Sequence, residues 1–359
     1  MAQYEQSTTS VTTTLGTSGL APSTLSAITH LLSGSTTTTL SAGGGSATVP
    51  AGTNIVTVGS GQVLTTDPAS PIIIMAHDAP AADVVFSGGT NRVVVTGGGN
   101  NNLVFSGFGD STIQTGGGND TIVAGTATGN LQVYLAGGNP SVLTGSGADL
   151  VTITGTGNVT VNTGGGDDRI VISSDLANST IVGGTGHNQV IIHDSHTNHF
   201  VTNVNGHAVV HSAATAQLTN IQVIEYDDGI SIIASTPEKA IVARMYEVAF
   251  GRQADIPGIN YWMDRLDAGE TVTQILKDFV GSPEFKAHHA SQTNTEFLTS
   301  LYLGLANRAP DTQGLAGWLD QMAHGATQAE IAFGFADSLE AINLMGITGT
   351  QYVIDNGIG

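Results

Sequence analysis

The stretches TGGGNDTIV, at residues 115–123, and TGGGDDRIV, at 163–171, decide the fold of this chain. Each joins a glycine-rich turn to an acidic residue and a short run of β-branched side chains. Related turns recur through the middle of the chain, and each can be marked by the sixth position of the template G-G-x-G-x-D-x-U-x, where U is apolar. The steps between marks are 9 to 11 residues, and the marks are Asn91, Asn101, Asp110, Asp120, Leu131, Pro140, Asp149, Val159, Asp168, Ser179 and Asn188.

An apolar or β-forming residue follows each mark by two positions. The weak member of this second series is Thr112, and Ile113 follows it directly. A short strand and a glycine turn that alternate every nine to ten residues are typical of a parallel β-roll, in which stacked coils share one core. Glycine suits such turns because they need positive φ angles and close backbone approach. We therefore expect a mainly β parallel roll or solenoid over residues 51–235, and Asn54 and Asp83 suggest that residues 51–87 add coils to it.

These turns resemble the calcium-binding repeats of the RTX (repeats-in-toxin) secreted proteins, over residues 88–192. GGTGHNQVI (183–191) is a third match, with Asn in place of Asp. The resemblance implies a two-edged roll whose turns bind Ca²⁺. It also implies type I secretion from Gram-negative bacteria and a location outside the cell or on its surface. The uncleaved signal of that route is C-terminal, so residues 346–359 are the candidate secretion signal.

Calcium sites are expected where neighbouring turns stack on one edge of the roll. Alternate marks share an edge, which groups Asn91, Asp110, Leu131, Asp149, Asp168 and Asn188 on one side. On the other edge Pro140 and Val159 interrupt the series. Ca²⁺ takes six to eight oxygen ligands, typically carboxylates and backbone carbonyls. The candidate ligands are Asp110, Asp120, Asp149, Asp167, Asp168 and Asn188. In the alternative, Asn ladders or plain glycine turns hold the solenoid without metal, because most turns lack Asp.

A second repeat, with an offset of 56 residues, occupies residues 236–345. Its two copies contain GRQADIPGINYW (251–262) and NRAPDTQGLAGW (307–318). Thr271 with Gln274, and Thr327 with Glu330, have the spacing of helix capping boxes, and Asp255 and Asp311 stand where helix N-caps belong. The pattern predicts an all-helical module with about three helices in each copy. Trp262 and Trp318 are expected in its core, and Arg252 and Arg308 are expected to pair with Asp255 and Asp311.

The two copies resemble a small helical domain of unknown function that often follows RTX repeats in secreted bacterial proteins. A related helical domain of RTX-type surface-layer proteins serves as their anchor to lipopolysaccharide. The resemblance therefore implies lipopolysaccharide or an exopolysaccharide as a partner of this module.

Composition excludes several classes of function. The chain carries 9 Lys+Arg against 29 Asp+Glu, a net charge of −20, which cannot form the basic surface needed to bind nucleic acid. No apolar run reaches the 18 or more residues of a membrane span. With no Cys, disulfides, cysteine zinc sites and thiol nucleophiles are excluded.

The first 50 residues are rich in Ser and Thr, and this composition predicts a flexible leader with no cleaved signal peptide. Within it, Leu20 to Leu32 could form a short helix.

No enzyme motif is present. The sequence has no G-x-S-x-G, no H-E-x-x-H and no P-loop, and Asp167 and Asp168 would face opposite sides of a strand. Six of the 11 His lie between residues 187 and 211, but their spacing fits no single helix or strand face, so a polar loop is favoured over a metal site.

We therefore expect a secreted structural protein that forms or joins a surface layer, sheath or filament, folds with Ca²⁺ and assembles with copies of itself. The alternative is a polysaccharide- or lipopolysaccharide-binding adhesin or matrix protein, anchored through the helical module.

Overall fold

A computed structural model describes thirteen stretches of the chain: residues 2–6, 37–42, 47–48, 55–58, 63–65, 72–75, 83–87, 91–107, 109–173, 178–204, 207–289, 291–345 and 352–355. It divides into two compact units, Met1–His193 with Val210–Ile221, and Asp194–Val209 with Gln222–Gly359. The helix considered for Leu20 to Leu32 and most of the expected secretion signal lie outside the described residues.

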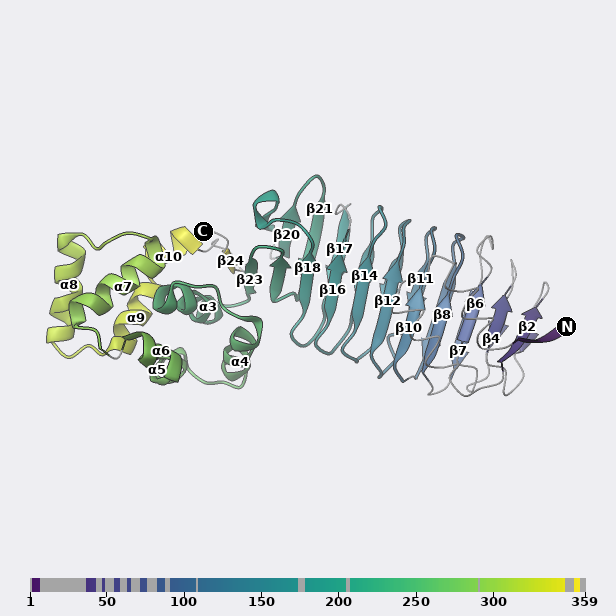
Figure 1. The fold of residues 1–359 in the computed structure, drawn as a ribbon, viewed down its shortest axis with the longest axis horizontal. Helices are drawn as coiled ribbons and strands as arrows, with labels where there is room; N and C mark the ends of the chain where they lie inside the picture. Colours follow the sequence, from purple (N-terminus) through teal and green to yellow (C-terminus); the bar gives the residue numbers. More distant parts are fainter. Residues whose placement is uncertain are drawn as a thin grey trace. The chain divides into compact units, whose positions relative to one another are not determined.

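The first unit is a parallel β-solenoid, as the repeat period predicts (Figure 1). One sheet contains, in spatial order, β2 (Thr37–Ala42), β4 (Ile55–Val58), β6 (Ile72–Met75), β8 (Arg92–Val95), β10 (Ser111–Gln114), β12 (Leu131–Leu135), β14 (Leu150–Ile153), β16 (Arg169–Ile172) and β18 (Gln189–Ile192). The other contains β3 (Ala47–Thr48), β5 (Val63–Thr65), β7 (Asp83–Ser87), β9 (Asn102–Ser106), β11 (Thr121–Val123), β13 (Ser141–Leu143), β15 (Thr160–Asn162), β17 (Ser179–Val182) and β21 (Thr215–Thr219). The chain therefore alternates between the two sheets, strand by strand.

The strands β4 to β7 pair in parallel within the same two sheets, so the described strands between residues 55 and 87 continue the roll. β1 (Ala2–Gln6) pairs with β2 in the antiparallel direction. Three strands, β1, β2 and β3, thus lie in the stretch whose composition suggested a flexible leader.

The interior of the solenoid is a column of aliphatic side chains, one from each strand. Its members are almost fully buried, and from Leu103 onward they are Leu103, Ile113, Ile122, Val133, Val142, Val151, Val161, Ile170, Ile181 and Val190. Each lies opposite its neighbours in the strands before and after it in its own sheet. Except for Ile113, these are the apolar positions of the sequence template.

The exception reveals a shift in register. In the structure Ile113 pairs with Val133 and with Val94, and Ser111 pairs with Leu131. The template had instead placed Thr112 and Val93 in the interior column. That placement is wrong by one residue for the strands β8 and β10.

The second unit contains the strands β19 (Phe200–Val204), β22 (Val223–Tyr226), β23 (Ile230–Ala234) and β24 (Tyr352–Asp355), and a 3-10 turn, η1 (His196–Asn198). β20 (His207–His211) spans the boundary between the units. β23 pairs with both β22 and β24 in the antiparallel direction.

Eight helices follow in the described residues, four from each copy of the 56-residue repeat. The first copy forms α3 (Pro237–Phe250), α4 (Ile256–Asp267), α5 (Val272–Gly281) and α6 (Pro283–His289). The second forms α7 (Asn294–Ala306), α8 (Thr312–Ala323), α9 (Gln328–Ala336) and α10 (Leu339–Met345). The expectation of three helices per copy is wrong, because α6 and α10 are additional. Ser282 and Ser338 start them by accepting the backbone N–H of Phe285 and Ala341, each at 3.1 Å.

The other helix starts are as predicted. Asp255 and Asp311 cap α4 and α8, each accepting a glycine backbone N–H at 2.8 Å. The capping boxes of Thr271 and Thr327 are both formed, at the starts of α5 and α9.

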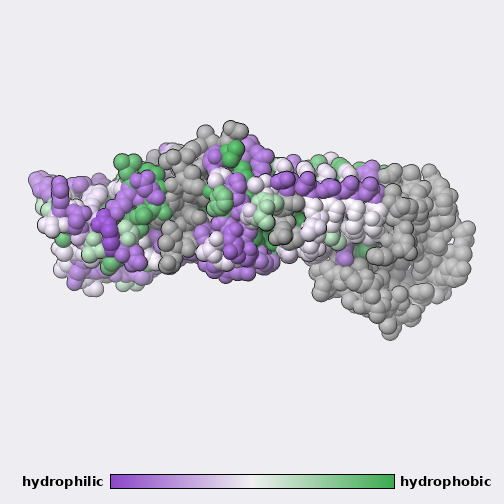
Figure 2. All heavy atoms as spheres, turned by 90° about the horizontal axis from the view of Figure 1, so that it is seen from above, coloured by the Kyte–Doolittle hydropathy of each residue, from purple (hydrophilic) through white to green (hydrophobic). Residues whose placement is uncertain are grey.

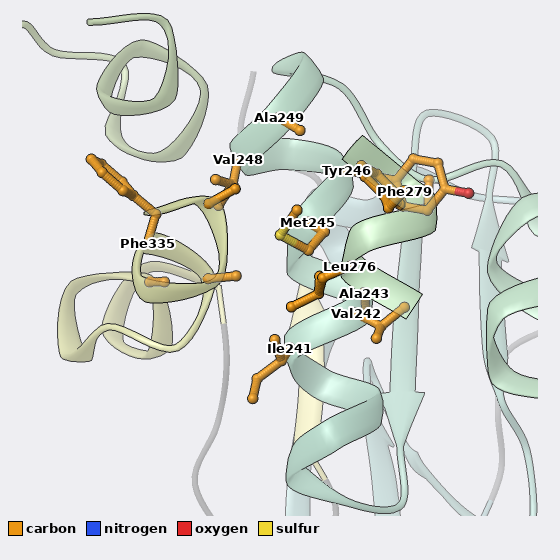
Figure 3. Close-up of a cluster of buried hydrophobic side chains, with 14 of the residues drawn as sticks. Ile241, Val242, Ala243, Met245, Tyr246, Val248, Ala249, Leu276, Phe279 and Phe335 are labelled. Carbon is orange, nitrogen blue, oxygen red and sulfur yellow. The ribbon is translucent and has the colours of Figure 1, made fainter. Parts of the chain in front are cut away.

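The core of the module is built around α3, whose buried side chains pack with those of α5 and α9 (Figure 3). Trp262 belongs to this core at 9% exposure, as expected, and its indole N–H donates to the Tyr246 hydroxyl at 3.1 Å. Trp318 is only partly buried and stacks on Phe335. None of the helices described here has the length and apolar character required to cross a bilayer.

Candidate functional site

The first edge of the solenoid carries a buried row of side chains that links successive coils. The backbone N–H of Leu131 donates to Asp149 at 2.7 Å, that of Asp149 to Asp168 at 2.8 Å, and that of Asp168 to Asn188 at 3.2 Å. Asn188 in turn donates its amide to the carbonyl of Asn220 at 3.0 Å. Three of the six candidate ligands, Asp149, Asp168 and Asn188, therefore lie in one continuous row, as the spacing predicted.

Asp110 does not belong to that row. Because Ser111, not Asp110, pairs with Leu131, Asp110 lies one position earlier, in line with Asn130, Ala148, Asp167 and His187. This second row is solvent-exposed. Its hydrogen bonds run the opposite way along the solenoid, since Asn130 and His187 donate their backbone N–H to Asp110 and Asp167 on the preceding coil, at 2.9 and 2.8 Å. Asp110 therefore shares the first edge with Asp149 and Asp168, as the spacing predicted, but it lies in the exposed row and not in the buried one.

The second edge carries Asp120, the remaining candidate ligand. Its Oδ1 accepts both the backbone N–H and the side-chain amide of Asn101, at 2.9 and 2.8 Å. The buried row stops after it, at Pro140, which has no N–H to donate, and Val159 donates its N–H to Ser179 at 3.1 Å.

The second edge also carries an asparagine ladder of the kind considered as the alternative to calcium, at positions that the template did not mark. Asn100, Asn119, Asn139 and Asn158 occupy the position before each mark. Each of the last three donates its backbone N–H to the side-chain oxygen of the asparagine one coil before, at 2.7 to 2.8 Å. Asn178 continues the spacing. The row lies on the surface, and Figure 2 shows a narrow hydrophilic line along the solenoid. Aligning the fifth template position would have found it.

The buried carboxylates are the chemically unusual feature of these edges. Asp120, Asp149 and Asp168 are at most 2% exposed. Each uses Oδ1 as an acceptor, whereas Oδ2 is buried and meets no donor at full hydrogen-bond geometry. Burial raises the pKa of all three, and that of Asp168 to about 6, with a further contribution from the negative charges of Asp149 and Asp167. The hydroxyls of Thr115, Thr144 and Thr163 lie close to the three carboxylates and partly offset the effect of burial on their pKa values.

A cation fits this arrangement on one edge better than on the other. Asp149 and Asp168 lie on adjacent coils and each presents a buried oxygen that meets no donor at full hydrogen-bond geometry, so a hard cation between the coils would find two carboxylate ligands. Asp120 has no carboxylate neighbour in its row. No group of three or more His, Asp or Glu side chains within the described stretches has the geometry to hold a metal.

The histidine-rich segment is only partly the polar loop that was expected, because His193, His196 and His199 lie in the turn around η1 whereas His207 and His211 lie in the strand β20. His199 contacts Asp194 through Nε2 at 3.1 Å, and the backbone N–H of His196 donates to Asp228 at 2.6 Å. The rings of both histidines pack on Tyr226. These contacts connect η1 with the turn after β22 within the second unit.

The helical module repeats one set of ionic contacts. Arg252 donates to Glu284, and Arg308 to Glu340, with closest distances of 2.7 Å in both copies. Each guanidinium also covers a tyrosine ring, that of Tyr246 or Tyr302, at 5.2 and 5.0 Å from the ring centre. The predicted partners Asp255 and Asp311 are farther, at 3.5 and 3.8 Å. Glu284 and Glu340 are equivalent positions of the 56-residue repeat, and the fourth helix of each copy, α6 or α10, brings them to the arginines.

Comparison with known proteins finds one kind of match. No curated protein and no solved structure matches the chain. Residues 234–289 and 276–345 each match the model of a domain of unknown function (DUF4214), so the helical module is similar to two consecutive copies of that domain.

Proposed function

We propose that this chain is a secreted, non-enzymatic structural protein that assembles with copies of itself into a surface layer, sheath or filament outside the cell. The observation that supports this proposal most is that the polar turn residues hydrogen-bond from one coil to the next. In the described coils they form ladders from one coil to the next, so they serve stacking in place of substrate binding. Such a stack presents unpaired backbone groups wherever a sheet ends on an uncovered strand, and further strands can add there.

Calcium is part of the same proposal. The buried oxygens of Asp149 and Asp168 carry negative charge that is costly to bury without a partner, and a divalent cation between the two coils would supply one. Outside the cell, where calcium is abundant, the ion would stabilise this edge. The −20 net charge of the chain adds to the repulsion that a cation relieves.

Negative-stain electron microscopy of the purified chain, with calcium and with excess chelator, tests both parts. We expect ordered sheets or filaments with calcium only. Dispersed monomers in both conditions would contradict assembly, and polymers in both would contradict the role of calcium.

Two double variants sharpen the test, because each removes two negative charges and keeps an oxygen acceptor for the ladder. The variant Asp149→Asn with Asp168→Asn changes the buried row. We expect its assembly to be the same with calcium and with chelator. Asp110→Asn with Asp167→Asn changes the exposed row, and we expect it to behave as the unaltered chain.

A further inference from the structure

The helical module contains a pocket of about 550 Å³ that lies between its two repeats. α5 and α6 of the first repeat form one wall, and the start of α9 from the second repeat forms the other. Its polar lining consists of Lys277, Lys286, His289, Gln292, Thr327 and Gln328. A volume of this size accommodates a small organic ligand.

Two of the three lysines in the whole chain line this one pocket. The other basic residues of residues 237–345 are engaged elsewhere. Lys239, Arg252, Arg265 and Arg308 form ion pairs, and the buried Arg244 donates to the carbonyl of Ala336 at 2.7 Å. Within the described part of the chain, neither Lys277 nor Lys286 has a carboxylate within ion-pair distance.

Glu330 is a carboxylate that feels the charge of Lys277, and its hydrogen bonds serve the start of α9. It accepts the backbone N–H and the hydroxyl of Thr327 at 2.8 and 2.9 Å, in the capping box of α9. Those hydrogen bonds, followed by the charge of Lys277, keep the pKa of Glu330 below its ordinary value. Two lysines without an ion-pair partner therefore line one pocket of a protein that is otherwise strongly acidic.

The internal repeat distinguishes the charged residues that the module needs for folding from Lys277 and Lys286. The contact of Arg252 with Glu284 recurs as that of Arg308 with Glu340, which marks it as a requirement of the module. By the same offset of 56, Lys277 corresponds to Phe333 and Lys286 to Ile342. The module thus folds in its second copy without these lysines.

A fixed polar wall completes the pocket. His289 is 4% exposed, and its Nε2 donates to the carbonyl of Ala249 while its Nδ1 meets the side chain of Gln292, both at 2.8 Å. These contacts hold the imidazole and the amide in place. Gln292 and Gln328 can hydrogen-bond to ligand hydroxyls, and Val280 and Phe285 supply apolar lining.

We infer that this pocket binds a small hydroxylated anion, an acidic or phosphorylated sugar unit, through Lys277 and Lys286. The lysines would hold the carboxylate or phosphate, and the amides of Gln292 and Gln328 would hold the sugar hydroxyls. This binding goes beyond the proposed assembly and does not depend on it.

Isothermal titration calorimetry of the full chain with glucuronate, glucose 6-phosphate, inorganic phosphate and glucose tests the inference. We expect binding of glucuronate or glucose 6-phosphate that weakens as salt is raised, and no binding of glucose. Whichever of the two sugars binds identifies the anion. Glucose binding as tightly as either anion, or neither anion binding, would overturn the inference, and inorganic phosphate binding as tightly as glucose 6-phosphate would overturn its sugar component.

The variant Lys277→Gln with Lys286→Gln should weaken that binding by about tenfold or more, because two charge-assisted contacts are lost. Its matched control is Arg169→Gln with Lys239→Gln, which removes the same charge away from the pocket and should bind as the unaltered chain does. Both lysines are exposed, so the thermal midpoint should not change. Equal binding by the two double variants would refute the pocket as the site.

Discussion

The backbone N–H of Asp149 donates to Oδ1 of Asp168, one coil further along the solenoid, at 2.8 Å. Both side chains are buried, and the negative charge of Asp149 contributes to the raised pKa of Asp168. The same contact that connects two coils therefore places two acidic groups in one buried row. The following predictions rest on this relationship and on its counterparts in the turns and in the helical module.

Removing the hydrogen-bond acceptor at position 168 should lower the free energy of unfolding more than removing the negative charge of Asp168. In Asp168→Ala the N–H of Asp149 is left buried without a partner, and we expect a loss of about 1–3 kcal/mol in the free energy of unfolding. Asp168→Asn retains an oxygen for that N–H and removes a buried charge, so in chelator at neutral pH it should be at least as stable as the unaltered chain. Urea unfolding measures both. A greater loss in the Asn variant than in the Ala variant would contradict this account.

In the presence of a chelator, the free energy of unfolding should fall as the pH rises from about 4 to about 6. Burial raises the pKa of Asp168 from its ordinary value of 3.8 to about 6, so in this window the folded chain binds a proton that the unfolded chain releases. The stabilisation is complete below about pH 4 and is lost as pH passes 6, a change of up to about 3 kcal/mol for this group. The free energy of unfolding, followed against pH, measures it.

Asp168→Asn should flatten this dependence, and Asp167→Asn, in the exposed row, should leave it intact. Under the proposed function, calcium should also flatten it, because the ion stabilises the ionised form. An unchanged slope in Asp168→Asn would contradict the assignment to this residue.

The turns should tolerate a methyl group at Gly117 but not at Gly138. Gly138 has φ +78°, and a Cβ there would overlap the carbonyl of Gly118 on the neighbouring coil. At Gly117 a Cβ would meet no atom within 4 Å. Gly138→Ala should therefore lower the free energy of unfolding by about 2 kcal/mol or more, whereas Gly117→Ala should leave it almost unchanged. Thermal unfolding of the two variants side by side would show the contrast, and equal midpoints would refute it.

The two tryptophans of the helical module should differ in their contribution to stability. Trp262 is buried and donates to the hydroxyl of Tyr246, whereas the equivalent Trp318 is only partly buried. Trp262→Phe loses that hydrogen bond and opens a cavity. It should therefore lower the free energy of unfolding by about 1 kcal/mol more than Trp318→Phe does. Chemical unfolding monitored by circular dichroism compares them, and an equal or opposite ranking would count against the asymmetry.

The sequence by itself determined the two repeats and hence most of the architecture. A nine- to ten-residue alternation of glycine turn and apolar residue allows only a stacked solenoid to bury its aliphatic column. The capping boxes at Thr271 and Thr327 likewise define where α5 and α9 begin, because capping depends on residues only three positions apart. The adjacency of Asp149, Asp168 and Asn188 also followed from spacing alone.

Tertiary structure decided whatever depends on register and on contacts between distant segments. One extra residue in a turn moved Asp110 out of the row of Asp149 and aligned it with Asn130, and Thr112 had been the sign of this shift. The pairing of Arg252 with Glu284 depends on the fold of a short helix 32 residues away. The pocket of Lys277 and Lys286 exists only where the first repeat meets the first turn of α9, because packing, not local spacing, sets that distance.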